Sequence, residues 1–253
     1  MSLVDDVYQD AISSLRSCCH PIGLKASGRR FGHHQVWARD SMIALLGGSL
    51  IDDAGIRTAL VASVEVLRSK ISSSGCIPNN VDAVSGKPNF RAYADAGLWW
   101  IIGSSLVAPD FETCSRVLTW YDCQDVDQSG LLSMQEGTDW QDLFCTRGKG
   151  LYLNCLYVLA LESAAKLAGP QGQQYLDRAQ TVRNNLNEYH WYRGDGKMRR
   201  HVAHTFSTES KEAQDSLGRK RFLPKKKILI DEQYYLPYLA FRAVGEWFDS
   251  LGH

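Results

Sequence analysis

The chain has 253 residues, of which 44% are hydrophobic and 22% are charged, a composition that is typical of a folded globular protein and excludes a disordered or fibrous one. Lysine plus arginine equals aspartate plus glutamate at 28 each, so no overall field favours nucleic acid or an anionic membrane. The acidic start at Met1–Asp6 and the lack of an apolar run near ~18 residues predict neither a signal peptide nor a membrane span.

Helical periodicity dominates the chain. Apolar residues recur three and four positions apart, beginning with Leu3, Val7 and Ala11, which is the spacing of an amphipathic helix. The same period predicts helices over residues 3–15, 41–50, 54–71, 96–108, 110–123, 150–168 and 173–189. Alternating strand patterns are scarce, so we expect one all-α domain over residues 1–253, with about seven or eight helices.

Local start and stop signals agree with these helices. Asp52 or Asp53 is placed to cap the third helix, and Pro109–Asp110 precedes the fifth. Gly169–Pro170 follows the sixth and ends it. The seven cysteines are odd in number and lack a paired Cys-x-x-Cys spacing, so we expect reduced thiols in a cytoplasmic protein.

The connections between the helices alternate in length. Long ones cover residues 20–40, 72–95, 124–149 and 190–230, and short ones lie at 51–53, near 109 and at 169–172. In a series of antiparallel helices, alternate connections lie at the same end. Long loops in compact domains are usually functional. We therefore expect one end of an array of inner and outer helices to form a site.

The first long connection ends in aromatic and charged residues just before a helix. Arg39 and Asp40 are adjacent, so a guanidinium and a carboxylate could hold neighbouring hydroxyls while Trp37 stacks on a sugar ring. The alternative is that Asp40 is only an N-cap and Arg39 a surface charge. His33 and His34 have no third ligand at a recognised spacing, so no metal site is expected.

The second long connection offers a similar group. Tyr93 and Asp95 precede a helix whose first turn contains Trp99 and Trp100, an arrangement suited to hydrogen bonding and stacking on a sugar. Adjacent helical residues point in different directions, so at least one tryptophan is expected in the core. We expect Tyr93 and Asp95 to contact the ligand, with N-capping by Asp95 as the alternative.

The third long connection concentrates carboxylates around one aromatic residue. Glu136 and Asp139 flank the glycine-bearing turn before Trp140. A glycosidic oxygen leaves only when it is protonated, and a carboxylic acid beside an aromatic wall can keep its proton near neutral pH. This stretch is therefore the candidate acid site.

The same connection also matches a calcium loop. Asp125, Asp127 and Glu136 stand at positions 1, 3 and 12 of a twelve-residue loop with Gly130 at position 6. A single calcium loop without a paired second one is uncommon, and Gly137 interrupts the helix that should follow. We favour a tight acidic turn and expect no cofactor, with calcium as the alternative.

A basic run occupies the fourth connection. Residues 219–227 contain six cations, which could contact nucleic acid. Such runs are usually solvated loops, and no matching basic stripe accompanies this one. We therefore expect no nucleic-acid partner.

Four motifs together resemble a known clan of proteins. They are Trp37–Asp40 (WARD), Asp95–Trp100 (DAGLWW), Glu136–Trp140 (EGTDW) and Tyr235–Gly252. They resemble the six-hairpin glycosidases, and within that clan the carboxy-terminal amylo-α-1,6-glucosidase domain of glycogen debranching enzymes and the neutral invertases. The resemblance covers about residue 30 to the end. Its motifs are specific for the clan and much less so for a substrate.

The resemblance implies a fold and a set of roles. The fold would be an (α/α)6 toroid of six inner and six outer helices, with the active site at the end where the long loops gather. Arg39 and Asp40 would hold the nonreducing-end sugar, Asp95 would line the same subsite, and Asp139 matches the general acid. The residues that would shape the pocket of this acid are Glu136 and Trp140.

The chain departs from the clan at its far end. Most members invert stereochemistry and need a second carboxylate as a base, placed late in the toroid. This chain stops at His253, inside a motif that normally continues, which predicts an incomplete toroid without its base. Glu232 is the best substitute in the chain, and a solvent-facing acid at a helix start is the alternative for it.

These observations predict a glycoside hydrolase that acts on a terminal α-glucoside or related sugar by inversion. Its partner is a carbohydrate, and neither nucleic acid nor membrane is expected. Two alternatives stay open: a sugar epimerase or isomerase on a similar helical toroid, and a noncatalytic carbohydrate- or calcium-binding module.

Overall fold

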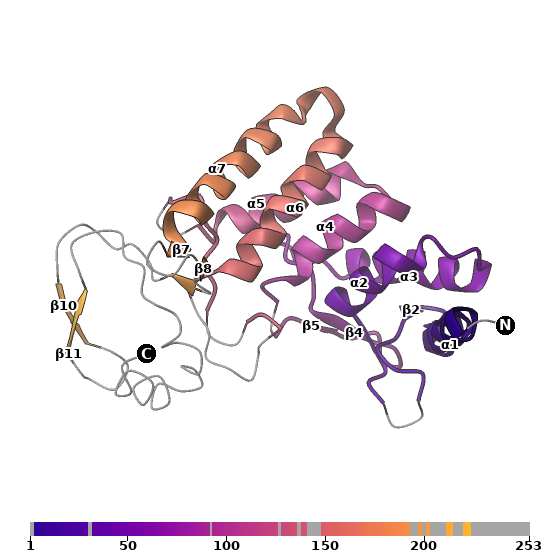
Figure 1. The fold of residues 1–253 in the computed structure, drawn as a ribbon. Coiled ribbons are helices and arrows are strands. Elements are labelled where there is room, and N and C mark those ends of the chain that lie inside the picture. Colours follow the sequence, from indigo (N-terminus) through magenta and orange to yellow (C-terminus); the bar gives the residue numbers. More distant parts are fainter. Residues whose placement is uncertain are drawn as a thin grey trace. The chain divides into compact units, whose positions relative to one another are not determined.

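The computed structural model describes residues 3–29, 32–91, 93–125, 128–135, 138–140 and 148–192, with short segments at 197–198, 201–202, 211–214 and 220–223. This part contains seven α-helices (Figure 1). They are α1 (Leu3–Cys18), α2 (Ala38–Gly48), α3 (Ala54–Ser69), α4 (Ala96–Val107), α5 (Phe111–Asp122), α6 (Leu151–Ala168) and α7 (Gln173–Tyr189), with a 3-10 turn, η1 (Gly169–Gln171), between the last two. Every predicted helix is confirmed, to within about one turn at each end.

The helices alternate in character along the chain. No charged residue occurs in α4, and the only charges of α2 lie in its first turn. By contrast, α3, α5 and α7 each carry one apolar and one charged face. A helix that is apolar on all sides needs burial on all sides, whereas an amphipathic one covers a core with one face. This is the pattern of inner helices (α2, α4, α6) alternating with outer helices (α3, α5, α7).

The predicted helix ends are also confirmed. The Asp53 carboxylate accepts a hydrogen bond from the Ile56 N–H at 2.8 Å and caps α3. The Asp110 carboxylate accepts one from the Thr113 N–H at 3.0 Å and caps α5. Gly169, with φ of +56°, follows the last residue of α6, because a glycine adopts this left-handed conformation without strain.

Short strands occupy the long connections, where the sequence shows few alternating patterns. Each is two to four residues long, which is too short for an alternating pattern to show. Every strand pair is antiparallel: β1 with β2, β3 with β4, β4 with β5, β6 with β9, β7 with β8, and β10 with β11. The strands are β1 (Cys19–His20), β2 (Gly23–Leu24), β3 (Gln35–Trp37), β4 (Asn80–Asp82), β5 (Pro88–Asn89), β6 (Lys149–Gly150), β7 (Trp191–Tyr192), β8 (Lys197–Met198), β9 (His201–Val202), β10 (Lys211–Gln214) and β11 (Lys220–Leu223).

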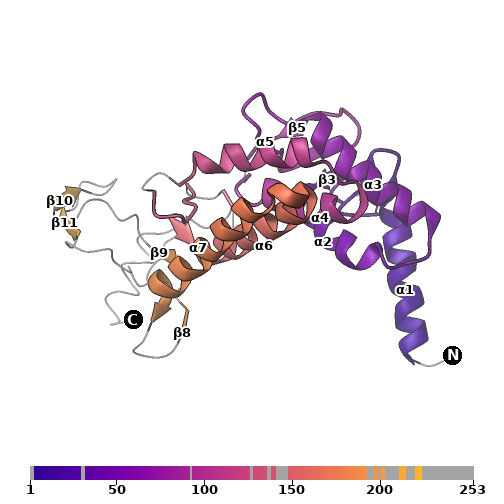
Figure 2. The ribbon, with the colours of Figure 1, turned by 90° about the horizontal axis from the view of Figure 1, so that it is seen from above.

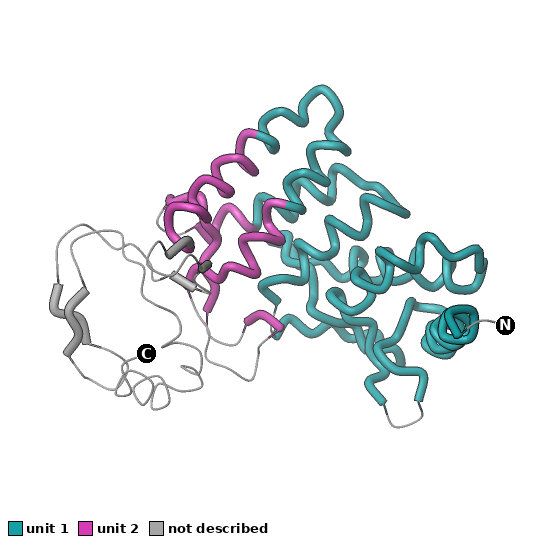
Figure 3. The backbone as a smooth tube through the Cα atoms, in the orientation of Figure 1, with its two compact units in different colours: residues 1–120, 159–176 teal, residues 121–158, 177–253 magenta. Residues whose placement is uncertain are grey.

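The chain divides into two compact units (Figure 3). Unit 1 contains residues 1–120 and 159–176, and unit 2 contains residues 121–158 and 177–253. The boundary therefore passes through α5, α6 and α7. The single domain over residues 1–253 stays a prediction, and each unit is described by itself.

The core of unit 1 forms where α2 packs against α3 and α4. Gly103 permits close approach of α4 to α2, because a Cβ atom at this position would lie 3.0 Å from the Met42 Cβ. Trp100 is fully buried and its indole N–H donates to the Val64 carbonyl of α3 at 3.0 Å. The expected core tryptophan is thus Trp100. Only the end of α1 joins this core, through Ile12, and the rest of that helix extends away from α3 (Figure 2).

One helix contradicts the expectation that no apolar run approaches a membrane span. The segment Leu151–Gln171, formed by α6 and η1, is long and apolar enough to cross a membrane by length and composition. Half of its most apolar window is buried within the structure, and Leu153 and Leu161 are among its buried residues. An inner helix of a protein core meets the same criteria.

Candidate functional site

An ion pair joins the starts of two neighbouring inner helices in unit 1. The Arg39 guanidinium, on α2, donates through Nη1 to both carboxylate oxygens of Asp95, at 3.3 and 3.1 Å. The Asp95 side chain is fully buried, and the Arg39 side chain keeps 20% of its surface exposed. The geometry therefore holds a guanidinium in a fixed position at the loop end of α2 and α4, with part of it facing out.

Both capping alternatives fail at these helix starts. Asp40 is the third residue of α2, whose N-cap is Trp37, so Asp40 is not an N-cap. Asp95 does occupy the N-cap position of α4, yet its side chain makes no capping hydrogen bond there. Its carboxylate serves Arg39 instead. Direct contact of Asp40 and Asp95 with a sugar stays a prediction.

The first two long connections meet beside this ion pair. β3 pairs with β4 so that Trp37 lies opposite Asn80, and the Ala38 N–H donates to the Asn79 carbonyl at 2.8 Å. These contacts join the start of α2 to the connection that leads to α4. Within unit 1, the long connections therefore share one end, as their alternation predicts.

Tyr93 lies in the same connection, one turn before α4. Its ring packs edge to face on Trp120, with centroids 5.5 Å apart. Burial, and then the neighbouring Cys76 thiol, raises the pKa of Tyr93. The phenol therefore stays neutral and keeps both a donor and an acceptor for a hydroxyl. Its contact with a sugar stays a prediction.

In unit 2, Asp139 and Trp140 differ sharply in burial. Asp139 is 2% exposed, whereas Trp140 is 49% exposed. The Trp140 ring packs edge to face on Tyr152, with centroids 6.3 Å apart, which leaves aromatic surface open for stacking. The Asp139 carboxyl is thus held out of bulk water, as we expect of an acid that keeps its proton, whereas the Trp140 ring is exposed to water, as we expect of a stacking surface. Glu136 lies outside the described residues.

A buried amide fixes the chain that leads to Asp139. The Asn154 side chain of α6 accepts from the Leu132 N–H at 2.7 Å and donates to the Leu132 and Gly150 carbonyls at 3.0 Å each. Met134 and Gly148 form an isolated antiparallel bridge. Both ends of the acid-bearing loop are therefore tied to the start of α6.

The chain makes a tight turn at Asp125. Its carboxylate accepts hydrogen bonds from the N–H groups of Ser129 and Gly130 at 2.9 and 2.8 Å, and Gly130 has φ of +78°. These donors belong to the loop itself. The other two calcium candidates, Asp127 and Glu136, lie outside the described residues, and calcium binding stays a prediction.

The sequence pattern does not predict the burial of four polar residues. Asn79 and Asn80 are 3% and 4% exposed, and Lys149 and His190 are fully buried. Polar residues in long connections are ordinarily exposed. Their burial depends on strand pairing and loop packing, which periodicity does not predict. Asn80 has further consequences, developed below.

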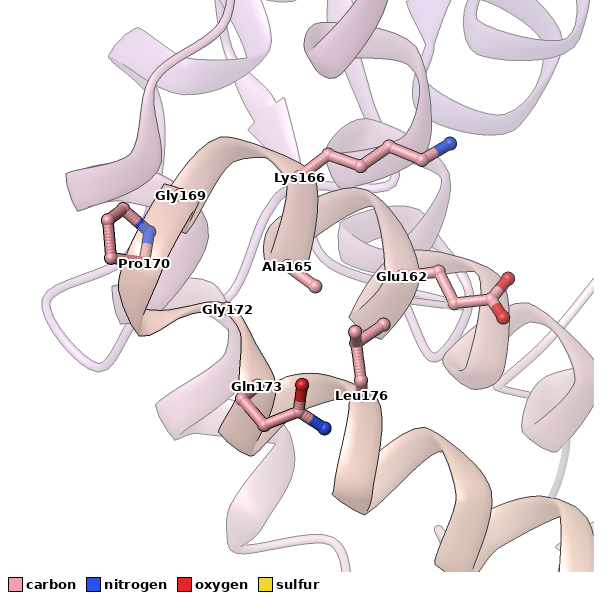
Figure 4. A pocket seen from close by; sticks show the side chains of 8 residues that line it. All are labelled: Glu162, Ala165, Lys166, Gly169, Pro170, Gly172, Gln173 and Leu176. Atoms are coloured by element: carbon pink, nitrogen blue, oxygen red, sulfur yellow. The ribbon is translucent and has the colours of Figure 1, made fainter.

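A shallow groove of about 580 Å³ lies at the turn between α6 and α7 (Figure 4). Glu162, Lys166 and Gln173 supply its polar groups, and Leu176 its largest apolar side chain. No aromatic ring lines it, so it lacks the stacking surface that suits a sugar. It belongs to a short connection and not to the candidate site.

The candidate residues are divided between the two units. Trp37, Arg39, Asp40, Tyr93 and Asp95 belong to unit 1, whereas Asp139 and Trp140 belong to unit 2. The structure describes the contacts of each group within its own unit. The alternative base Glu232 and most of the basic run over residues 219–227 lie outside the described residues.

Comparison with solved structures identifies the fold. The chain is similar to a D-mannose isomerase (TM-score 0.57, 19% identity, 79% of this chain and 55% of that one). It is also similar to a rhamnosidase from Klebsiella oxytoca with rhamnose bound (TM-score 0.58, 15% identity, 77% and 40%) and to an unsaturated glucuronyl hydrolase from Bacillus sp. GL1 (TM-score 0.52, 14% identity, 79% and 60%). The chain thus spans about half the length of these structures.

No family model and no curated protein sequence matches the chain. The resemblance to amylo-α-1,6-glucosidase domains and neutral invertases therefore stays a prediction. The similar structures have six-hairpin glycosidase-like folds. The chain is all-α and has the fold of part of an (α/α)6 toroid.

Proposed function

We propose that this chain is part of a carbohydrate-processing enzyme, a glycoside hydrolase that acts on a terminal α-glucoside or related sugar. One observation carries the proposal: the Arg39–Asp95 ion pair beside Trp37, where two long connections meet. Burying a charged pair is expensive, and a structural role alone is met as well by apolar packing. A fixed guanidinium next to an indole ring suits a polyhydroxylated ligand.

The solved structures of this fold support the same class. One of these proteins is named an isomerase of D-mannose, and another is named a hydrolase of unsaturated glucuronyl groups. The third is named a rhamnosidase and has rhamnose bound. A fold does not by itself imply a function, so the proposal depends on the site as well.

In the proposed reaction, Asp139 protonates the glycosidic oxygen as the bond to the anomeric carbon breaks. A water molecule attacks the opposite face of the sugar, and a second carboxylate takes its proton, which gives inversion. The proposed role of Arg39, Asp40 and Trp37 in unit 1 is to bind and orient the terminal sugar, and that of Trp140 in unit 2 is to shape the pocket of the acid. No cofactor is required for this chemistry.

The test replaces Asp139 and compares the turnover of isomaltose by the variant with that by the wild type. We expect Asp139→Asn to lower kcat by about 100- to 10,000-fold, the usual contribution of a general acid. Turnover of α-glucosyl fluoride should fall much less, because fluoride leaves without a proton. Asp10→Asn, an exposed aspartate of α1, is the matched control and should leave both rates unchanged.

One result would remove the assignment. Full activity of Asp139→Asn on isomaltose would exclude Asp139 as the acid. The same measurements on Glu136→Gln and on Asp142→Asn, which changes the aspartate three positions after Asp139, would then show which neighbouring carboxyl is the acid.

A sugar isomerase is the second candidate, because one structure of this fold is named a D-mannose isomerase. An isomerase moves protons between neighbouring carbons and breaks no glycosidic bond. Incubation with D-mannose and with isomaltose, followed by proton NMR, separates the two. A ketose formed from mannose, with isomaltose intact, would favour the isomerase.

A further inference from the structure

One face of the β3–β4 strand pair carries polar side chains next to the candidate sugar site. Residues opposite each other in an antiparallel pair share a face, so Gln35 lies with Asp82, and Trp37 lies with Asn80. The other face carries Val36, which is fully buried. Because β3 runs directly into α2, the polar face adjoins Arg39.

Hydrogen bonding on this face is incomplete. The Trp37 Nε1 and the Gln35 Oε1 are enclosed, and neither has a hydrogen-bond partner among the described residues. Asn80 is 4% exposed, and none of the side-chain hydrogen bonds among the described residues involves it. Buried polar groups in folded proteins nearly always have partners, so each exception calls for a water or a ligand.

The orientation of the Gln35 amide is fixed by its neighbour. Its Nε2 donates to the Asp82 carboxylate at 3.4 Å. The N–H of Ser85 and its hydroxyl lower the pKa of Asp82, so this carboxylate is ionised and can only accept. The amide nitrogen must therefore face Asp82, and the carbonyl oxygen is the group without a partner.

These groups select for a hydroxyl. The Trp37 indole can only donate and the Gln35 carbonyl can only accept, while the Asn80 amide can do both. A carboxylate or phosphate has no proton to give to Gln35, and an ammonium has no lone pair for Trp37. Neighbouring hydroxyls of a neutral sugar satisfy all three groups.

We propose that Gln35 and Asn80, with the indole N–H of Trp37, bind hydroxyls of the sugar that occupies the site beside Arg39. This inference rests on the proposed function and extends it, because it makes the amides of β3 and β4 determinants of sugar specificity. The competing explanation is an enclosed water molecule with a purely structural role.

The experiment measures binding of methyl α-D-glucoside and isomaltose to this chain by isothermal titration calorimetry. Gln35→Met and Asn80→Leu remove the amides while keeping much of the side-chain shape. We expect each to weaken binding by about 3- to 10-fold, the factor that corresponds to one neutral hydrogen bond. Gln174→Met and Asn184→Leu, at exposed positions of α7, are the matched controls and should bind as the wild type does.

Melting of the unliganded protein separates the ligand from a structural water. Removing a polar atom that has no partner is close to neutral or stabilising, so the proposal predicts an unchanged or higher Tm for Asn80→Leu. Gln35→Met also removes the N–H that donates to Asp82, so Asn80→Leu alone carries this comparison. A bound water would lose a partner instead, and Tm would fall. Deoxy derivatives of methyl α-D-glucoside add a second check, because the sugar that lacks the Gln35-bound hydroxyl should bind wild type and Gln35→Met equally.

The outcomes are distinct. Wild-type affinity in both variants would overturn the role of the amides and leave the proposed function intact. A lowered Tm of Asn80→Leu with wild-type affinity would assign the position to water and overturn it as well. Failure of the wild-type chain to bind either sugar would overturn both this inference and the proposed sugar site.

Discussion

The loop ends of the two units are built in different ways. In unit 1, the candidate sugar-binding residues lie at the starts of helices, where Arg39 pairs with the buried Asp95 through two side chains. In unit 2, the candidate acid Asp139 lies in a loop, and the Asn154 amide holds the start of that loop through backbone groups. The candidate sugar-binding residues are thus held by an ion pair between helix starts, whereas the candidate acid lies in a loop that is held by hydrogen bonds to its backbone.

This difference has energetic consequences. An amide that satisfies several backbone groups is irreplaceable, because its removal leaves buried donors and acceptors unpaired. An ion pair can be removed as a unit at a smaller net cost than that of either partner alone. A second substitution should therefore restore part of the stability lost on breaking the ion pair in unit 1, but not that lost on removing the amide in unit 2.

The largest effect on stability is expected in unit 2. Asn154→Ala leaves the Leu132 N–H and carbonyl and the Gly150 carbonyl without their partner, which should destabilise the fold by about 3–4 kcal/mol. Urea unfolding measures the loss, and hydrogen exchange at residues 131–135 should rise with it. Asn184→Ala on α7 is the control. A loss below about 1 kcal/mol would contradict the assigned role of the amide.

Breaking the ion pair of unit 1 should have the next largest effect. Asp95→Ala leaves the Arg39 guanidinium without its buried partner, and we expect the free energy of unfolding to fall by about 2–3 kcal/mol. This loss is at or below the low end of the range for breaking a buried ion pair, because Arg39 is partly exposed. The double variant Arg39→Met, Asp95→Ala should regain part of this loss in urea unfolding. Strict additivity of the two single changes would contradict the comparison between the units.

A smaller effect is expected at the start of α5, away from both loop ends. Burial opposes ionisation of Asp110, yet the hydroxyl and N–H of Thr113 and the Arg68 guanidinium lower its pKa to about 2. Asp110→Ala should cost about 1–2 kcal/mol, mainly through the lost cap, because the ion pair is partly exposed. Sugar affinity should not change, and a change would show that the site depends on α5.

The contribution of Asp110 depends on pH in a defined direction. Because its folded pKa lies below the unfolded value of about 3.9, the stabilisation is present above that value and is lost as the pH falls towards about 2. The difference in unfolding free energy between wild type and Asp110→Asn should therefore shrink between about pH 4 and pH 2. A constant difference across this window would contradict a lowered pKa.

The smallest effect on stability is expected at Trp140. Its side chain is 49% exposed and packs edge to face on Tyr152, so Trp140→Ala should lower the free energy of unfolding by about 1 kcal/mol. If the ring stacks on sugar, KM or Kd for isomaltose should rise by more than this small loss of stability explains. Trp140→Phe should restore much of the affinity, and loss of stability without loss of affinity would assign the ring to packing.

The sequence by itself determined the helices and their order. Periodicity and caps act within a few residues, so the bounds of α1 to α7 and the capping roles of Asp53 and Asp110 could be predicted from local patterns. The alternation of long and short connections also predicted that the loops beside Trp37 and Asn80 meet. The residue types at the helix starts singled out Arg39 and Asp95, which the structure joins in an ion pair.

Only the tertiary structure decided how these residues are used. Arg39 and Asp95 are separated by 56 positions, and no local pattern shows that they pair. The short strands escape prediction because two or three residues carry no period, and strand pairing is what places Gln35 and Asn80 beside Trp37. Burial and partner choice depend on contacts between distant segments, so the chemistry of this site belongs to the fold, and the sequence alone shows only its ingredients.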